Sequence, residues 1–74
     1  MVLIPYVVFK FNSTLKEHRE KKGFTQEGLA RQLGVSRQTI VNIEKGLNEP
    51  RVLLAIAIAG LLGVAVIDLF HEKS

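Results

Sequence analysis

The chain has 74 residues, with 10 Lys and Arg against 7 Asp and Glu, and it contains neither Cys nor Trp. A chain of this length forms one domain, and without cysteine its stability must come from apolar packing or from association. Hydrophobic residues make up 47% of the chain, which is enough for a core and argues against disorder. Because an active-site cleft of ordinary volume is hard to build from so few residues, we do not expect an enzyme.

Charge is unevenly distributed along the chain. Residues 1–51 carry nine Lys and Arg and five Glu, a net charge of +4, whereas residues 52–74 carry a net charge of −1. The basic part suggests an anionic partner, which could be nucleic acid or an anionic membrane. The neutral, apolar part suggests a surface for packing or association.

Two apolar segments raise the question of a membrane. Residues 52–67 form a run of sixteen without a charge, but a spanning helix needs about 20 such residues, and the run contains Gly60 and Gly63. The apolar N-terminus lacks the basic region and the small-residue cleavage site of a signal peptide. We therefore expect no membrane association and a cytoplasmic location.

Residues 1–11 are rich in β-branched and aromatic side chains, which is typical of an extended arm or a strand, with Pro5 near its start. No second strand of similar quality is apparent in the sequence. We therefore expect any strand pairing to involve another copy of the chain, or the arm to pack on helices.

Five helices are expected after the arm, each bounded by a capping residue or a glycine. They span about 15–22, 25–33, 36–45, 51–62 and 66–70, and a polar tail follows. Asn12, Ser13 and Thr14 are expected to cap the first helix, and Ser36 to cap the third. Gly28 stands in place of a capping-box Glu, and the lost Glu and the glycine together are expected to cost on the order of 1 kcal/mol. Ala65 stands in place of a Ser or Thr cap, which leaves Asp68 without its reciprocal partner.

The second and third helices have the spacing of a helix-turn-helix. Leu29 and Ala30 lie on one face of the second helix, and Gly34 marks a tight turn before the third. Ile40 and Ile43 are placed to pack back on the second helix, and the small Ala30 allows the two helices to cross closely.

The segment TQEGLARQLGVSRQTIVNIEKG (25–46) resembles the helix-turn-helix core of the phage Cro/cI-type repressors, the Xre family. The similarity continues back to LKEHREKKGFTQ (15–26) and on through Pro50 to GVAVIDLF (63–70), about 56 residues in all. The resemblance implies an all-α, five-helix, lambda-repressor-like DNA-binding domain that binds operator DNA, usually as a homodimer. With the extended N-terminal arm at 1–11, the domain would occupy residues 12–74.

Three side chains of the third helix are candidates for reading bases. At about 100° per residue, Gln38, Asn42 and Lys45 share a polar wedge flanked by Arg37 and Val41. Ile40 and Ile43 point the other way, toward the core. Arg can bind guanine through two hydrogen bonds, and Gln or Asn can bind adenine in the same way. By resemblance, Arg37, Gln38 and Asn42 match the base-reading positions of the family, and the competing interpretation is a solvated helix face.

Other residues are assigned to the DNA backbone or to the fold. Gln26, Ser36, Thr39 and Lys45 are candidate phosphate contacts, and Ser36 can also act as a helix cap. The resemblance implies an ion pair between Arg19 and Glu44 that joins the first helix to the third.

His18 stands where the family prefers Leu, and we expect a partly exposed packing residue. Only His71 remains as a second imidazole, so we expect no metal site. No cofactor and no small-molecule substrate are expected.

The fourth helix is apolar on both faces. Val52, Leu54, Ala55, Ile58, Ala59 and Leu62 form the expected core face, and the opposite face holds Leu53, Ile56, Ala57, Gly60 and Leu61. Since a helix that is apolar all round is buried on both sides, we expect the outer face to be covered by a second subunit, by the N-terminal arm, or by both.

The sequence therefore predicts a sequence-specific DNA-binding transcriptional regulator. We expect a repressor that binds a near-palindromic operator as a homodimer. The alternative is a protein-interaction module, antitoxin-like or an adaptor, that uses the arm and the outer face of the fourth helix.

Overall fold

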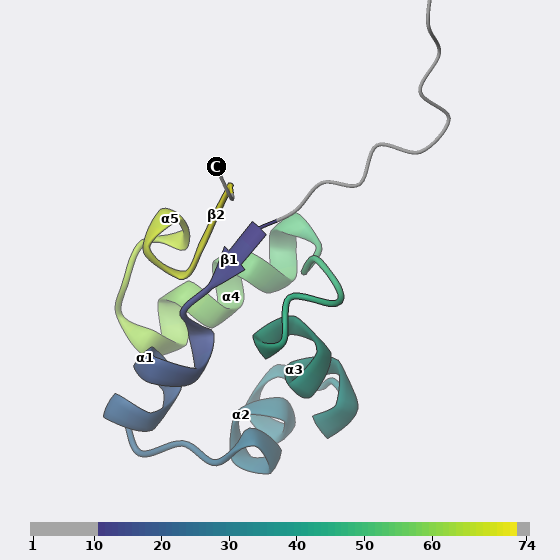
Figure 1. Ribbon diagram of the computed structural model, residues 1–74. Helices are drawn as coiled ribbons and strands as arrows, with labels where there is room; N and C mark the ends of the chain where they lie inside the picture. Colours follow the sequence, from purple (N-terminus) through teal and green to yellow (C-terminus); the bar gives the residue numbers. More distant parts are fainter. Residues whose placement is uncertain (1–10, 73–74) are drawn as a thin grey trace, which may run out of the picture.

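The computed structural model describes residues 11–72, which form five helices and a two-stranded antiparallel ribbon (Figure 1). In chain order the elements are β1 Phe11–Ser13, α1 Leu15–Lys21, α2 Gln26–Leu33, α3 Arg37–Glu44, α4 Val52–Leu62, α5 Val66–Leu69 and β2 Phe70–Glu72. The predicted all-α, five-helix fold is confirmed. None of the helices in residues 11–72 is long and apolar enough to cross a membrane.

The prediction that the chain holds no partner strand was wrong. β1 pairs antiparallel with β2, with Asn12 opposite His71 at the centre of the register. The strand replaces the end of the predicted fifth helix, because Phe70 adopts extended angles of φ −134° and ψ 121°. The predicted arm at residues 1–10 lies outside the described residues.

The start of α1 also differs from the prediction. Thr14 is the N-cap residue, but its side chain makes no cap hydrogen bond. Its backbone N–H instead donates to the carbonyl of Leu69 at 2.9 Å, and its hydroxyl donates to the carbonyl of Asp68 at 2.6 Å. β1 and β2 join the segment before α1 to the segment after α5. Thr14 adds two hydrogen bonds to this connection.

The turns around α2 and α3 follow the predicted chemistry. Ser36 accepts a hydrogen bond from the backbone N–H of Thr39 at 3.1 Å, and Thr25 accepts one from that of Gly28 at 2.8 Å. A side-chain carbon at Gly28 would lie 3.0 Å from the Thr25 hydroxyl, which is a tight contact. Gly34 adopts φ +70°, a left-handed conformation that disfavours a side chain, and this ends α2.

The core lies where the five helices meet. Its largest fully buried side chains are Leu15, Leu29, Ile40, Ile43, Ile58, Leu62 and Leu69. Ala55, Ile58, Ala59 and Leu62 occupy the core face of α4, as predicted, and Leu54 is half-buried. Val52 was wrongly predicted there, because it is the first residue of α4 and lies beyond the covered part of the helix, with 73% of its surface exposed.

The N-terminus of α5 is only half capped. Asp68 accepts a hydrogen bond from the backbone N–H of Ala65 at 3.2 Å, but Ala65 has no oxygen with which to reciprocate. Ala65 already has the extended backbone of a capping residue, at φ −79° and ψ 152°.

We expect Ala65→Ser to stabilise the domain, because a hydroxyl at this position completes the capping box. The expected gain is about 1 kcal/mol in the free energy of unfolding and about 5 °C in Tm, measured by thermal denaturation followed by circular dichroism. Ala65→Val serves as the control, because it adds atoms at the same exposed position without supplying an oxygen, and it should give no such gain. An unchanged Tm for Ala65→Ser would contradict the proposed cap.

Candidate nucleic-acid interface

α2, the turn and α3 form one packed unit at the bottom of Figure 1. Leu29 and Ala30 of α2 and Ile40 and Ile43 of α3 are all buried in the core. The turn is closed by a hydrogen bond of 3.0 Å from the backbone N–H of Val35 to the carbonyl of Ala30. With its apolar side fixed in this way, α3 turns its polar side outward.

That polar side carries the three candidate base readers. Arg37 and Gln38 are exposed, and Asn42 is half-buried. The side-chain amide of Gln38 donates to the amide oxygen of Asn42 at 2.9 Å, so the two amides lie next to each other, one helical turn apart. Each side chain still has both donor and acceptor capacity, which is what recognition of an adenine edge requires.

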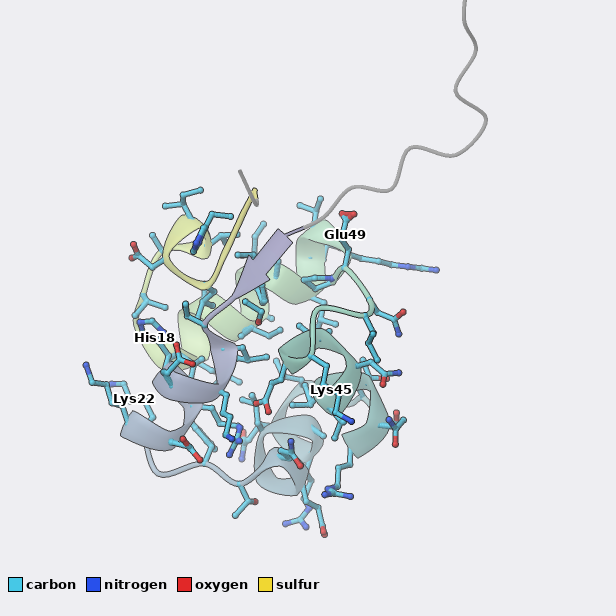
Figure 2. All side chains as sticks on the ribbon, viewed as in Figure 1. His18, Lys22, Lys45 and Glu49 are labelled. Carbon is cyan, nitrogen blue, oxygen red and sulfur yellow. The ribbon has the colours of Figure 1, made fainter. Side chains whose placement is uncertain are left out.

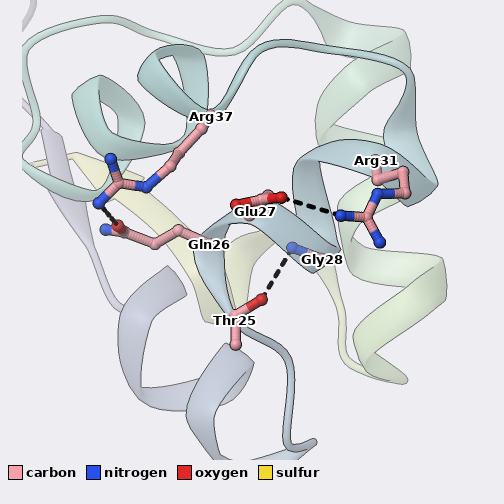
Figure 3. Close-up of a pocket in the computed structure, with 6 residues that line it drawn as sticks. All are labelled: Thr25, Gln26, Glu27, Gly28, Arg31 and Arg37. Atoms are coloured by element: carbon pink, nitrogen blue, oxygen red, sulfur yellow. Dashed lines mark hydrogen bonds and ion pairs between the residues drawn. The ribbon is translucent and has the colours of Figure 1, made fainter.

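Arg37, the first residue of α3, contacts the first residue of α2. Its guanidinium donates to the amide oxygen of Gln26 at 3.0 Å. A hollow lies over the N-terminal turn of α2, and Figure 3 shows the Arg37 and Gln26 side chains meeting at one side of it. On the other side of the hollow, Arg31 pairs with Glu27 at 2.9 Å. The start of α3 is thereby connected to the start of α2.

Gln26 also reaches the interior. Its amide nitrogen donates to Glu44 at 3.0 Å. Glu44 in turn pairs with Arg19, whose Nε lies 2.6 Å from the carboxylate, and the Arg19 guanidinium donates to the carbonyl of Phe24 at 2.7 Å. A continuous polar network therefore runs from the buried Arg19 on α1, through Glu44 and Gln26, to Arg37 at the surface.

This network gives Gln26 a role that the sequence does not predict. The sequence predicts only a phosphate contact for Gln26, but the residue also joins the buried ion pair to Arg37. An amide nitrogen carries two hydrogens, and Glu44 takes one of them, so a second donor remains for a phosphate. The only sequence signal for the link is that Gln26 and Arg37 begin consecutive helices.

The other candidate phosphate contacts lie at both ends of α3. The hydroxyls of Ser36 and Thr39 are 2.9 Å apart at its N-terminus, where Ser36 also acts as the cap. Lys45 follows the last residue of the helix and is exposed (Figure 2). The two hydroxyls therefore lie in the first turn of α3 and Lys45 lies just after its last residue, on the same helix as the three candidate base readers.

His18 lies apart from this face (Figure 2). It is half-buried, and its Nδ1 lies 3.0 Å from the carbonyl of Thr14 and 3.3 Å from the Thr14 hydroxyl. Within residues 11–72, no three His, Cys, Asp or Glu side chains gather in a group that could hold a metal ion.

The comparisons with known proteins agree with this geometry. The helix-turn-helix family HTH_3 matches residues 15–69. The chain belongs to this Cro/cI-type, or Xre, family. Like other members, this Xre-family protein is a transcriptional regulator with a helix-turn-helix DNA-binding domain.

Relatives and solved structures match most of the Xre-family chain. An HTH-type transcriptional regulator of Methanocaldococcus jannaschii is 52% identical over 56 residues, which cover 76% of this chain and 85% of the relative. The restriction-modification controller protein C.AhdI of Aeromonas hydrophila superposes with a TM-score of 0.67 at 30% identity, covering 76% of this chain and 85% of the other. The biofilm regulator SinR, solved in complex with DNA, gives a TM-score of 0.64 at 28% identity, covering 70% and 84%.

The chain contains a buried and an exposed ion pair that can be compared. The Arg19 and Glu44 side chains are 8% and 6% exposed, whereas those of Arg31 and Glu27 are 74% and 70% exposed. We expect Glu44→Ala to lower the free energy of unfolding by about 3–5 kcal/mol, because it leaves the buried Arg19 charge without its partner. Urea denaturation measures this loss.

Glu27→Ala is the matched control, since it also removes a glutamate that pairs with an arginine. We expect it to cost less than about 1 kcal/mol, because water screens an exposed pair. If the two variants lose the same free energy of unfolding, the buried pair contributes no more to stability than the exposed pair, and the prediction is wrong.

Proposed function

We propose that this regulator is a repressor that binds a near-palindromic operator as a homodimer, with α3 in the major groove. The observation that carries the proposal is the adjacent pair of amides, Gln38 and Asn42, on the exposed side of the second helix of a helix-turn-helix. Recognition helices of this motif contact base edges through the residues of their first turns. Arg37, Gln38 and Asn42 are therefore assigned to reading bases.

The backbone contacts complete the proposed interface. Gln26 at the start of α2 and the hydroxyls of Ser36 and Thr39 in the first turn of α3 are assigned to phosphates, and Lys45 is assigned to a phosphate near the C-terminal end of α3. Such contacts fix the register of the protein on DNA but carry no sequence information. Occupation of the operator, by blocking polymerase, is sufficient for repression.

The length of α3 supports the use of two copies. Its eight residues are about 12 Å long, a span of about four base pairs at about 3.4 Å per pair. So short a site recurs too often in a genome to be specific. A second copy related by a two-fold axis would read a second half-site about 34 Å away, and the operator would then be near-palindromic.

Selection of bound duplexes from a random DNA pool tests the assignment of bases. We expect the wild type to enrich a near-palindromic consensus, and the double variant Gln38→Ala, Asn42→Ala to lose it, because each bidentate contact contributes about 1–3 kcal/mol of discrimination. Gln32→Ala is the control, since Gln32 is an exposed glutamine on α2, and the consensus should be unchanged.

Each other outcome of the selection contradicts a specific part of the proposal. A consensus without palindromy would remove the two-copy operator but keep the readers. If the wild type enriches no consensus, sequence-specific binding is wrong, and the fold serves a protein partner instead.

Salt dependence tests the proposed phosphate contact of Lys45. We expect Lys45→Ala to weaken binding to all sequences and to reduce the slope of log K against log salt concentration by about 0.9, because one fewer counterion is released. Lys22→Ala removes the same charge, but Lys22 lies beside Gly63 and away from Lys45 (Figure 2). The slope for Lys22→Ala should change less, and equal slopes for the two variants would contradict the contact.

A further inference from the structure

One apolar side chain of α3 lies outside the core. The apolar residues of this helix are Ile40, Val41 and Ile43. Ile40 and Ile43 are buried in the core cluster, whereas Val41 is half-buried and belongs neither to that cluster nor to the apolar side chains packed against it. A β-branched residue also favours a helix less than most others do. Val41 therefore serves neither core packing nor helix propensity.

Val41 stands on the outward side of α3, among the candidate DNA contacts. At about 100° per residue, Arg37, Val41 and Lys45 follow one row along the helix, next to the row of Gln38 and Asn42. Arg37 and Lys45 are exposed, and each lies about 6 Å from Val41 along the helix axis. The outward side of α3 thus presents one apolar group between two cations and beside two amides.

These neighbours limit the kind of partner that can contact Val41. A protein that packed an apolar side chain on Val41 would also cover the cations of Arg37 and Lys45, and burying an unpaired charge is costly. DNA suits both kinds of group, because its phosphates attract the cations and its major groove offers an apolar group, the C5 methyl of thymine. The base 5-methylcytosine carries a methyl at the same ring carbon.

We propose that Val41 contacts the C5 methyl of a pyrimidine in the major groove of each operator half-site. The inference rests on the proposed function and adds a fourth base reader to Arg37, Gln38 and Asn42. Those three side chains respond to hydrogen-bond donors and acceptors on base edges. Val41 responds to a group that makes no hydrogen bond. Thymine and uracil present the same donors and acceptors, so only an apolar contact of this kind distinguishes them.

The position of Val41 also indicates where the methyl lies. Val41 and Asn42 are consecutive and differ by about 1.5 Å along the helix axis, which is less than the separation of about 3.4 Å between base pairs. A valine side chain is short, and an apolar contact requires heavy atoms within about 4.0–4.5 Å. We therefore expect the methyl in the base pair that Asn42 reads or in the adjacent one. The thymine paired with an adenine read by Asn42 is one such base.

Methyl substitution in the DNA tests the contact without changing any hydrogen-bonding group. In the consensus duplex selected from the random pool, each thymine is replaced in turn by deoxyuridine, and each cytosine by 5-methylcytosine, in both half-sites. Fluorescence anisotropy measures the Kd at one salt concentration. For the wild type we expect a position at which the methylated duplex binds about 15-fold tighter, because one buried methyl contributes about fourfold in each of two half-sites. Whether this position holds thymine or 5-methylcytosine identifies the base that supplies the methyl.

Val41→Ala should reduce this preference to below about threefold, because it removes the two methyl groups that meet the DNA. Its Kd for the unmethylated duplex should stay within about twofold of the wild-type value, since that duplex offers no methyl to lose. A general disturbance of α3 would weaken both duplexes equally. The variant should still fold, because alanine favours a helix more than valine does and Val41 lies outside the core. Circular dichroism verifies this.

Val66→Ala is the matched control, since it makes the same change in another helix. Val66 is a partly exposed valine, with 37% of its surface accessible, and it is the first residue of α5. Figure 1 shows α5 on the opposite side of the molecule from α3. The preference for the methylated duplex should remain about 15-fold in this variant.

Three results would each overturn the contact of Val41 with a methyl. These are a consensus in which no methyl changes the wild-type Kd, a preference that persists in Val41→Ala, and a methyl-dependent position more than about two base pairs from the one that Asn42→Ala relaxes. All three leave the assignment of Gln38 and Asn42 unchanged. A wild type that selects no consensus would instead overturn the proposed function, and the methyl contact with it.

Discussion

The position of α3 depends on one buried interaction, the ion pair between Arg19 and Glu44. Removing two charges from water is costly, and the cost is offset only where geometry and additional hydrogen bonds are good. Here the Arg19 guanidinium also donates to the Phe24 carbonyl, and Glu44 also accepts from Gln26. The Glu44 carboxylate, on the last residue of α3, thereby binds α1 through Arg19 and α2 through Gln26. Arg19 also binds the segment before α2 through the Phe24 carbonyl. An apolar contact would allow these elements to slide, whereas directed hydrogen bonds fix their relative rotation.

The same network has a consequence for recognition. Gln26 holds Arg37, and Gln38 holds Asn42, so the free protein keeps its candidate readers in ordered positions. Ordered side chains lose less conformational entropy on binding. They must, however, give up or share these hydrogen bonds when bases offer partners. A correct base pair replaces each bond with a bidentate contact, while an incorrect one leaves a group unpaired. In the proposed complex, preorganisation would therefore contribute to discrimination between bases as well as to affinity.

Much of the fold was predictable because it depends on local chemistry. Gly34 and Ser36 set the boundaries of α2 and α3 through the backbone conformation and the cap that these residues favour, and apolar spacing identified Ile40 and Ile43 as core. The ribbon was not predictable, because strands of three residues carry no usable periodicity and depend on Thr14 meeting the end of α5. The exposure of Val52 depends on how far the neighbouring elements extend over α4. The role of Gln26 depends on three helices meeting, which sequence spacing does not encode.

α4 supports the helix that the proposed function assigns to reading bases. Its inner side, through Ile58 and Leu62, belongs to the same core as Ile40 and Ile43 of α3. α4 packs on α2, and α2 packs on α3. Because protein cores are close-packed and transmit displacement, the position of α4 constrains the position of α3 through these shared side chains. The chain can therefore hold a helix of eight residues in one orientation, since the same core supports that helix from behind.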